Sequence, residues 1–286
     1  MTAISVEHWE VFAREPGGGN PCYLIRATEA VAVEAAQLAA RQHGAEAAIV
    51  AVEEAGIALR FFSPGGEMAM CGHATIAAVT ALVAAGELEG TKTVARTSAG
   101  SFPVGWDHGR PPLVSIDHLD LQIGPAVAAT GEVAGSLGMP ADRMTGGDLR
   151  VVSIARAKLL VPLVDAEAVH AARPDPDRLA ELCRAVGATG AYVFAPHPDG
   201  RPNHLVARQF PVDAGMAEDP ATGVAAGALA AYLASASGWS DIEVDQGDAM
   251  GRPSRLQARA FAADGAVSRV QVAGRAQLIG QERFRL

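Results

Sequence analysis

The sequence predicts an α+β protein made of two similar domains, each a rolled, mostly antiparallel sheet around one apolar helix. Two observations support this prediction. Residues 74–86 (ATIAAVTALVAAG) and 223–237 (GVAAGALAAYLASAS) carry no charged side chain, and a helix that is apolar on every side must be enclosed on every side. Both segments also follow the same local order of strand-like segments, which indicates an internal repeat.

The first half of the chain mixes hairpins with helices. Residues 4–12 and 22–25 are apolar and partly β-branched, and the turn-forming segment EPGGGNP separates them, so they predict a hairpin. Residues 30–41 have the apolar spacing of an amphipathic helix, and residues 47–52 and 58–62 predict a further pair of strands. This order does not match the regular strand–helix alternation of a parallel doubly wound sheet.

The second half of the chain repeats the order of the first. The segment RFFSP stands ahead of Cys71 as RQFP stands ahead of Asp219, which gives the repeat a spacing of 148 residues (219 − 71). Strand-like segments follow both apolar helices, at 94–104 and 114–116 in the first half and at 242–244 and 256–261 in the second. We therefore predict domains at residues 1–120 and 121–286, the last strand packing back on the first domain, and an active site between the two.

The composition narrows the class of protein. Of the 286 residues, 49% are hydrophobic and 19% charged, which is too apolar for disorder. The net charge of −9, without a dense stripe of lysine or arginine, argues against nucleic acid as a partner. As a helix, the uncharged run 74–85 would extend about 18 Å against roughly 30 Å of bilayer core, so no membrane span is expected. The start MTAISVEHWEVF lacks the pattern of a signal peptide, and a cytoplasmic protein is expected.

Cysteine and histidine spacings predict no metal site. The three cysteines include no CxxC pair, so neither a disulfide framework nor a thiolate zinc site is indicated. Cys71 and His73 alone lack the ligand count that zinc requires. The remaining histidines, His197 and His204 among them, show no ligand spacing and are interpreted as structural or exposed. A serine hydrolase is excluded because no nucleophile-elbow motif GxSxG is present.

Four motifs follow one another along nearly the whole chain: VFAREPGGGNP, RFFSPGGEMAMCGHAT, RQFPVDAGMAEDPATG and QGDAMGRPSRL. In this order they resemble the phenazine-biosynthesis isomerase-like (PhzF-like) proteins of the diaminopimelate epimerase-like fold. The resemblance implies an isomerase that moves a proton between two carbons, and so shifts a double bond, in a small carboxylated substrate. That substrate is expected to be amino-acid-like or a cyclohexadiene. The resemblance further implies that no metal or organic cofactor takes part and that the protein is a homodimer.

Glu46 is the candidate for the proton-transferring group. Carbon-to-carbon proton transfer needs a side chain that takes a proton and returns it, preferably sheltered from water. Glu46 lies among small apolar residues just before a predicted strand. Taken alone, this context favours a solvated loop carboxylate, but by resemblance Glu46 matches the family's catalytic glutamate. The family usually has hydroxyl residues on both sides of it, where this chain has Ala45 and Ala47.

His73 and Asp219 are the other catalytic candidates. A histidine beside an apolar helix is more often structural, but the CGHAT context resembles that of the family's catalytic histidine, so His73 is expected to act as a second acid/base or to polarise the substrate. Asp219 is assigned the equivalent place in the second repeat. An aspartate at a helix start is ordinarily a cap. The match of EDPATG to the family motif favours instead that Asp219 orients the substrate's amino group or His73.

Five further residues are predicted to bind substrate. Gly72 and Gly223 have no side chain to obstruct a carboxylate at a helix N-terminus, where partial positive charge favours an anion. Thr222 and Val224 flank the second of these glycines. Val224 stands where the family motif commonly has a serine, so the substrate is expected to differ from the phenazine precursor dihydro-hydroxyanthranilate or to be bound otherwise. Asn20 matches a family residue that donates to substrate, although turn geometry explains it equally.

Two alternative functions stay open on the sequence alone. The first is an amino-acid epimerase or racemase that uses Cys71, because a helix N-terminus makes a thiol a better base. Such a mechanism pairs two cysteines, and Asp219 rather than a cysteine stands at the matching place of the repeat. The second alternative is a non-catalytic binding protein of the same fold, favoured by Val224 and by the alanines beside Glu46.

Overall fold

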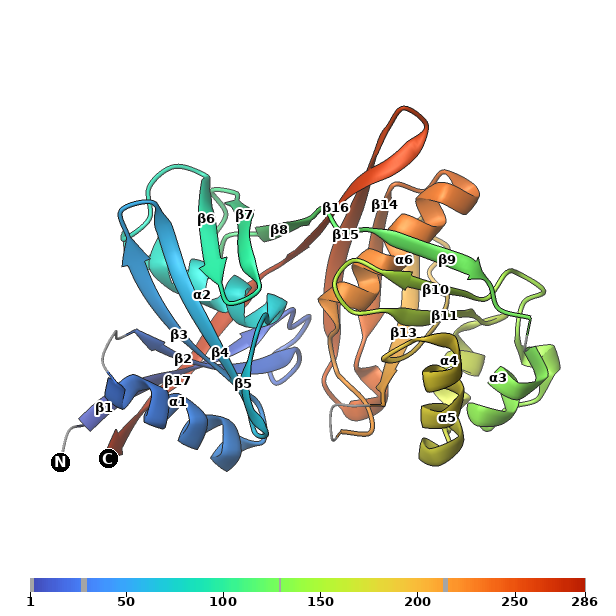
Figure 1. Cartoon of the computed structure of the whole chain (residues 1–286), viewed down its shortest axis with the longest axis horizontal. Coiled ribbons are helices and arrows are strands. Elements are labelled where there is room, and N and C mark those ends of the chain that lie inside the picture. Colours follow the sequence, from blue (N-terminus) through green and yellow to red (C-terminus); the bar gives the residue numbers. More distant parts are fainter. Residues whose placement is uncertain (1–2, 27–29, 129, 213–215, 286) are drawn as a thin grey trace. The chain divides into compact units, whose positions relative to one another are not determined.

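The chain forms two compact units. A computed structural model describes residues 3–26, 30–128, 130–212 and 216–285, and the elements are coloured along the chain in Figure 1. One unit comprises residues 1–117 with 273–286, and the other comprises residues 118–272. Each unit combines a mixed sheet with one enclosed apolar helix, which confirms the predicted fold class. No helix in the described part of the chain is long and apolar enough to cross a membrane.

The first unit is built on one strand order. Its elements are β1 (Ala3–Val11), β2 (Asn20–Arg26), α1 (Ala30–His43), β3 (Glu46–Glu53), β4 (Gly56–Ser63), β5 (Gly66–Met68), α2 (Gly72–Ala84), β6 (Lys92–Thr97), β7 (Gly100–Trp106), β8 (Val114–His118) and β17 (Ala276–Arg285). The strands pair in the order β17-β1-β2-β3-β4-β6-β7-β8, and β5 adds to β4. The β2–β3 and β4–β6 pairs are parallel, and the other pairs are antiparallel.

The predicted hairpin at the start of the chain is confirmed as β1 and β2. Gly19 ends the turn with φ +76°, and a Cβ there would lie 2.5 Å from the carbonyl oxygen of Val11. Only glycine fits this left-handed, crowded position. The turn therefore delivers Asn20 to the first position of β2, opposite Val11.

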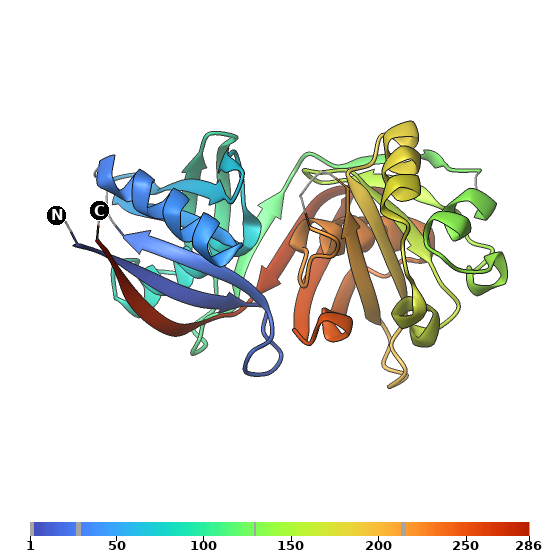
Figure 2. The same cartoon turned by 90° about the horizontal axis from the view of Figure 1, so that it is seen from below.

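Helix α1 covers the outer face of this sheet (Figure 2). Its inward side consists of alanines that are completely buried: Ala32, Ala35, Ala36, Ala39 and Ala40. Small side chains let the helix axis approach the strands, where Ile25 and Phe62 fill the space beneath it.

Helix α2 is enclosed, as its uncharged sequence predicts. Every residue from 74 to 82 is buried, and the helix packs against β1, β2, β3 and β17. Gly86, with φ +72°, follows the last turn, and Glu87 N donates to Leu82 O at 2.9 Å. Because residues 74–82 are buried, only the two ends of α2 are accessible, and Gly72 and His73 at its N-terminal end are half-buried.

The second unit contains the corresponding elements. They are β9 (Gln122–Ala126), α3 (Thr130–Ser136), the 3₁₀ turn η1 (Ala141–Arg143), β10 (Arg150–Ser153), β11 (Lys158–Pro162), α4 (Ala166–Ala171), α5 (Pro176–Val186), β12 (Gly190–Pro196), β13 (His204–Pro211), α6 (Gly223–Ser237), β14 (Asp241–Gln246), the 3₁₀ turn η2 (Asp248–Met250), β15 (Ser254–Ala263) and β16 (Ala266–Gly274). Helix α6 packs against β10, β11, β14 and β15, and its residues 225–231 are buried.

The pairing pattern confirms the internal repeat. From β1 to β7 the successive pairs are antiparallel, parallel, antiparallel, parallel and antiparallel. From β10 to β15 the same five relations recur in the same order. Helices also occupy the same places: α1 joins the first parallel pair and α4 with α5 joins its counterpart, while α2 and α6 join the second parallel pairs.

The predicted equivalence of Cys71 and Asp219 is wrong at the helix starts. Strands β4 and β13 keep the spacing of 148 residues (204 − 56), but α2 begins at Gly72 and α6 at Gly223, a spacing of 151 (223 − 72). Three extra residues therefore lie between strand and helix in the second unit. The N-cap of α6, which corresponds to Cys71, is Thr222.

Each repeat has an arginine at the same position of its corresponding strand. Arg60 and Arg208 stand at the spacing of 148, and each guanidinium lies over a phenylalanine ring of its own strand. Arg208 makes two hydrogen bonds to Glu218 at 2.9 and 2.7 Å, donates to the last carbonyls around α4, and is 8% exposed. Arg60 makes the same fork to Glu67 at 2.7 and 2.8 Å but is 49% exposed.

We expect Arg208→Lys to lower the free energy of unfolding by about 2 kcal/mol, because a lysine keeps the charge but not the fork of donors in a buried site. The matched variant Arg60→Lys is expected to cost less than about 1 kcal/mol, since water screens an exposed pair. Urea unfolding of both variants measures the difference. Equal costs would contradict the role assigned to burial.

Candidate active site

Glu46 lies where α1 turns into the sheet. The helix ends at His43, Gly44 takes the left-handed conformation with φ +62°, and Glu46 begins β3 beside Cys22 of β2. Ala45 between them is buried, and the Glu46 side chain is 19% exposed. The carboxylate is thus largely sheltered but reachable, and it is not the solvated loop group that its local context alone favours.

His73 faces this carboxylate. It is the second residue of α2, its side chain is 11% exposed, and its Nε2 lies 3.7 Å from Glu46 Oε2. Cys71, the N-cap residue, places its Sγ 3.5 Å from His73 Nδ1. The structure therefore brings together two of the three predicted catalytic residues, with the Cys71 sulfur against the imidazole.

The second thiol near Glu46 is inert. Cys22 is fully buried, and burial together with the negative charge of Glu46 raises the pKa of its thiol well above the usual range. A protonated buried thiol neither attacks a substrate nor binds a metal. Cys22 is therefore a packing residue beside the candidate base.

Asn20 and Gly72 lie in the same unit as Glu46. Asn20 is the first residue of β2, is 6% exposed, and stands two positions before Cys22, the register partner of Glu46. A Cβ at Gly72 would meet only Ile116 Cδ1, at 4.0 Å, so the first turn of α2 has room beside its backbone. The free N–H groups of a helix start form an anion site where such room exists.

Asp219 belongs to the other unit and is not a helix cap. Its Oδ2 accepts a hydrogen bond from Thr222 Oγ1 at 2.7 Å, and its Oδ1 accepts one from Ala221 N at 3.3 Å. Thr222 is the N-cap of α6, and Gly223 and Val224 form its half-buried first turn. Asp219 thus fixes the N-terminus of α6 from three residues before it.

Gln246 contacts Asp219 and Thr222, although no role is predicted for it from the sequence. Its Nε2 donates to Asp219 O at 2.7 Å and to Thr222 Oγ1 at 3.2 Å. Its Oε1 accepts from Tyr192 Oη at 3.1 Å and from Thr222 N at 3.4 Å. Gln246 and Tyr192 are completely buried. The signal was present in the motif QGDAMGRPSRL, which begins with this glutamine.

Tyr192 remains a hydrogen-bond donor. Burial and, second, the charge of Asp219 raise the pKa of its hydroxyl well above the usual range. The proton therefore stays on Oη and is available to Gln246. This chain of buried hydrogen bonds holds the backbone of Asp219 in one position.

Comparisons with known proteins agree with this architecture. The family model described as phenazine biosynthesis-like protein matches residues 9–281. An uncharacterized isomerase of Deinococcus radiodurans is 32% identical over 96% of this chain and 92% of its own length. The trans-2,3-dihydro-3-hydroxyanthranilate isomerase of Pseudomonas aeruginosa is 26% identical over 96% of both chains. A phenazine biosynthesis protein of the PhzF family from Bacillus anthracis has the same fold, with a TM-score of 0.88, 23% identity and complete coverage of both chains.

Proposed function

The chain belongs to the phenazine biosynthesis-like protein family and is an isomerase, and on this premise we propose that it moves a proton between two carbons of a small carboxylated substrate. The observation that carries the proposal is the sheltered pair of Glu46 and His73, 3.7 Å apart at the start of an enclosed helix. A carboxylate at that position takes a proton from one carbon and returns it to another.

The steps follow from the residues around this pair. Glu46 removes a proton from a carbon next to a double bond, the electron pair of the C–H bond shifts the double bond, and negative charge spreads toward the substrate carboxylate. The first N–H groups of α2, at Gly72 and His73, stabilise that charge. Protonated Glu46 then gives its proton to the far carbon, either directly or through His73, which passes one proton to that carbon and receives the one held by Glu46. Glu46 returns to its starting state, and no other reactant is consumed.

The remaining predicted residues are proposed to position the substrate. Asp219, held by Thr222 and Gln246, orients a substrate amino group, and Asn20 donates a hydrogen bond. Gly223 offers helix N–H groups as Gly72 does. Val224 in place of the usual serine supports a substrate other than that of the phenazine pathway, because a hydroxyl partner is missing.

The proposal is tested by NMR in deuterated water with small β,γ-unsaturated or dienyl amino and hydroxy acids. One of them is trans-2,3-dihydro-3-hydroxyanthranilate, after which the Pseudomonas relative is named. Deuterium at a new carbon together with a shifted double bond supports the proposal. Exchange at a single α-carbon with inversion supports an epimerase, and tight binding of a candidate without any exchange supports a binding protein.

An epimerase using Cys71 is the second candidate, because the Cys71 sulfur touches the His73 imidazole at the N-cap of α2. The corresponding N-cap of α6 is Thr222, which offers no second thiol. We therefore expect Cys71→Ala to retain deuterium incorporation within about tenfold of the wild type, a change in activation free energy below about 1.4 kcal/mol. Loss of several orders of magnitude would instead favour a thiol base.

We also propose that the protein acts in the cytoplasm as a homodimer. All three cysteines are buried and no disulfide joins them, in keeping with a reducing compartment. Leu278 and Ile279 on β17 are 50% and 46% exposed, and such apolar residues on a strand support self-association. Light scattering of the purified chain distinguishes dimer from monomer.

A further inference from the structure

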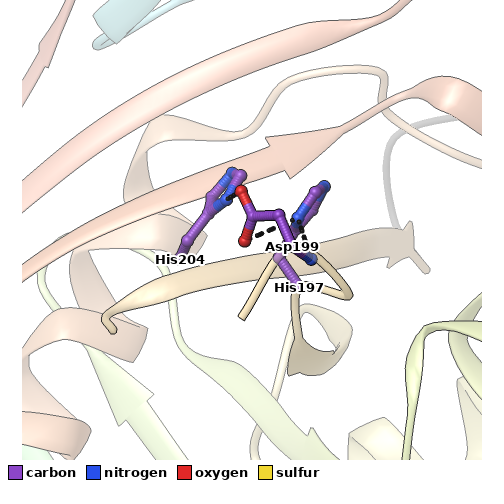
Figure 3. A group of neighbouring side chains, drawn as sticks. All are labelled: His197, Asp199 and His204. Carbon is purple, nitrogen blue, oxygen red and sulfur yellow. Dashed lines mark hydrogen bonds and ion pairs between the residues drawn. The ribbon is translucent and has the colours of Figure 1, made fainter. Parts of the chain in front are cut away.

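Two histidines and an aspartate meet at the turn between β12 and β13 (Figure 3). Asp199 Oδ1 lies 3.0 Å from His197 Nδ1, and Asp199 Oδ2 lies 2.8 Å from His204 Nδ1. One donor atom from each of the three residues lies within 4.8 Å of the others. The spacing H-x-D-x4-H did not suggest a ligand set, because the turn that folds His197 back onto His204 is not evident in the sequence.

Strand β14 adds carboxylates to the same place. Glu243 is the register partner of His204, and its Oε1 lies 3.6 Å from His204 Nε2. Asp245 Oδ2 lies 3.4 Å from His204 Nε2 and 3.6 Å from His197 Nε2. The cluster therefore joins imidazole nitrogens with carboxylate oxygens around a histidine side chain that is only 1% exposed.

Two arginines share these carboxylates in different ways. Arg255 forms a fork to buried Asp245 at 2.7 and 2.9 Å, which balances that charge. Arg201 instead contacts three of the candidate ligand atoms at once. Its Nε lies 2.6 Å from Asp199 Oδ2, and its Nη2 lies 2.9 Å from Glu243 Oε1 and 2.6 Å from His204 Nδ1. Its side chain is 51% exposed, so it is able to swing into water. The positively charged guanidinium thus occupies the position at which these nitrogen and oxygen atoms would hold a metal ion.

We propose that His197, Asp199 and His204 form a zinc-type metal site, with Glu243 as a fourth ligand and Arg201 as the group that competes with the ion. Two imidazole nitrogens with carboxylate oxygens are a donor set that suits Zn²⁺ and excludes neither Ni²⁺ nor Co²⁺. Arg255 forms its fork with Asp245 and lies farther, at 3.5 Å, from Glu243 Oε1, so the carboxylates more open to the ion are those of Asp199 and Glu243.

Binding requires two local movements. The rings of His197 and His204 stack with their centroids 3.9 Å apart and an angle of 24° between their planes, so their in-plane lone pairs lie in nearly parallel planes and do not converge on one ion. His197 follows the end of β12 and is 24% exposed, which lets its ring turn about its side-chain bonds. Arg201 leaves at the same time. The buried ring of His204 is the fixed point of the site.

The role of this site is structural. His204 and Glu243 pair at the start of the parallel strands β13 and β14, and Ala207 and Gln246 pair three residues further on, about 10 Å away at the usual strand rise. A bound ion would therefore tie the β12–β13 turn to Glu243 of β14. Gln246 is the last residue of that same strand.

The test is a zinc titration of the untagged protein, stripped of metal with a chelator, in competition with a colorimetric zinc indicator. We expect one equivalent of Zn²⁺ to bind, and we expect His197→Gln and Asp199→Asn each to weaken binding at least about tenfold. His108→Gln, at an exposed histidine of the other unit, is the matched control and leaves affinity unchanged. Binding that is absent, or equally strong in all three variants, overturns the proposal.

Arg201→Gln separates a metal site from a purely structural charge cluster. Removing a competing cation is expected to tighten Zn²⁺ binding about tenfold, whereas weaker or unchanged binding overturns the proposal. Co²⁺ in the wild type supplies a measurement that needs no variant: X-ray absorption is expected to report nitrogen and oxygen ligands. Sulfur ligands would show that the ion sits at a cysteine elsewhere, which overturns the assignment.

Discussion

Glu46→Gln is expected to abolish deuterium incorporation into the product, a loss of about 10²–10⁴-fold or more, while leaving ligand affinity within about tenfold. The amide has nearly the shape of the carboxylate but cannot take a proton, so chemistry fails while binding persists. The NMR assay measures the first effect, and isothermal titration with a substrate analogue measures the second.

Glu53→Gln is the matched control for that experiment. Glu53 ends the same strand, β3, but its side chain is 40% exposed and pairs with Arg96 at the surface. Its variant is expected to turn over at the wild-type rate. Unchanged incorporation in Glu46→Gln would remove Glu46 from the mechanism, even if the fold and the family assignment stand.

The second large effect is expected at Gly247. This glycine has φ +86°, and a Cβ there would lie 2.3 Å from Arg252 O and 2.7 Å from Pro220 O. Alanine therefore incurs the left-handed penalty of about 1–2 kcal/mol and a further cost of about 1–3 kcal/mol for crowding against backbone that cannot move aside. We expect Gly247→Ala to lose about 2–5 kcal/mol of unfolding free energy.

Gly251→Ala provides the comparison within the same motif. Its φ of +67° carries the same left-handed penalty, but no atom lies within 4 Å of the position that a Cβ would take, so only about 1–2 kcal/mol is expected. Urea unfolding gives both values. Because Pro220 follows Asp219, Gly247→Ala is also expected to lower turnover, whereas Gly251→Ala is not. Equal losses would show that the contact with Pro220 has no consequence.

The parts of the fold that are visible in the sequence are those that depend on local patterning. The uncharged stretches 74–86 and 223–237 predict enclosed helices, and residues 74–82 of α2 and 225–231 of α6 are buried as predicted. The last six residues of α6, 232–237, are half-buried or exposed, so the prediction of complete enclosure is wrong there. The turn of the β1–β2 hairpin, just before Asn20, is predicted by its glycines. By contrast, the amphipathic helix α5 was not predicted, although it has a proline at its start, Asp175 as its cap and Gly187 at its end.

The parts that are not visible depend on long-range register. The repeat looks uniform at 148 residues because β4 and β13 keep that spacing, and nothing local reveals three extra residues before α6. Gln246 reaches Asp219 and Thr222 only because β13 and β14 run parallel. The same pairing places Glu243 beside His204. A sequence motif can single out a residue such as Gln246, but the residues that it contacts follow only from the fold.

The pairing of β17 with β1 bears on how the chain folds as it is synthesised. Ala3 pairs with Arg285 and Val11 with Ala276, so the first unit needs strands from both ends of the sequence. Phe284 lies in the same core cluster as Val6, and α2 packs on β17. The second unit is continuous from residue 118 to 272. Domains generally fold in order of their emergence from the ribosome. In this chain we expect the second unit to be complete first, because the sheet of the first unit lacks β17 until that strand has been translated. Until then β1 would be an unpaired sheet edge, which favours aggregation.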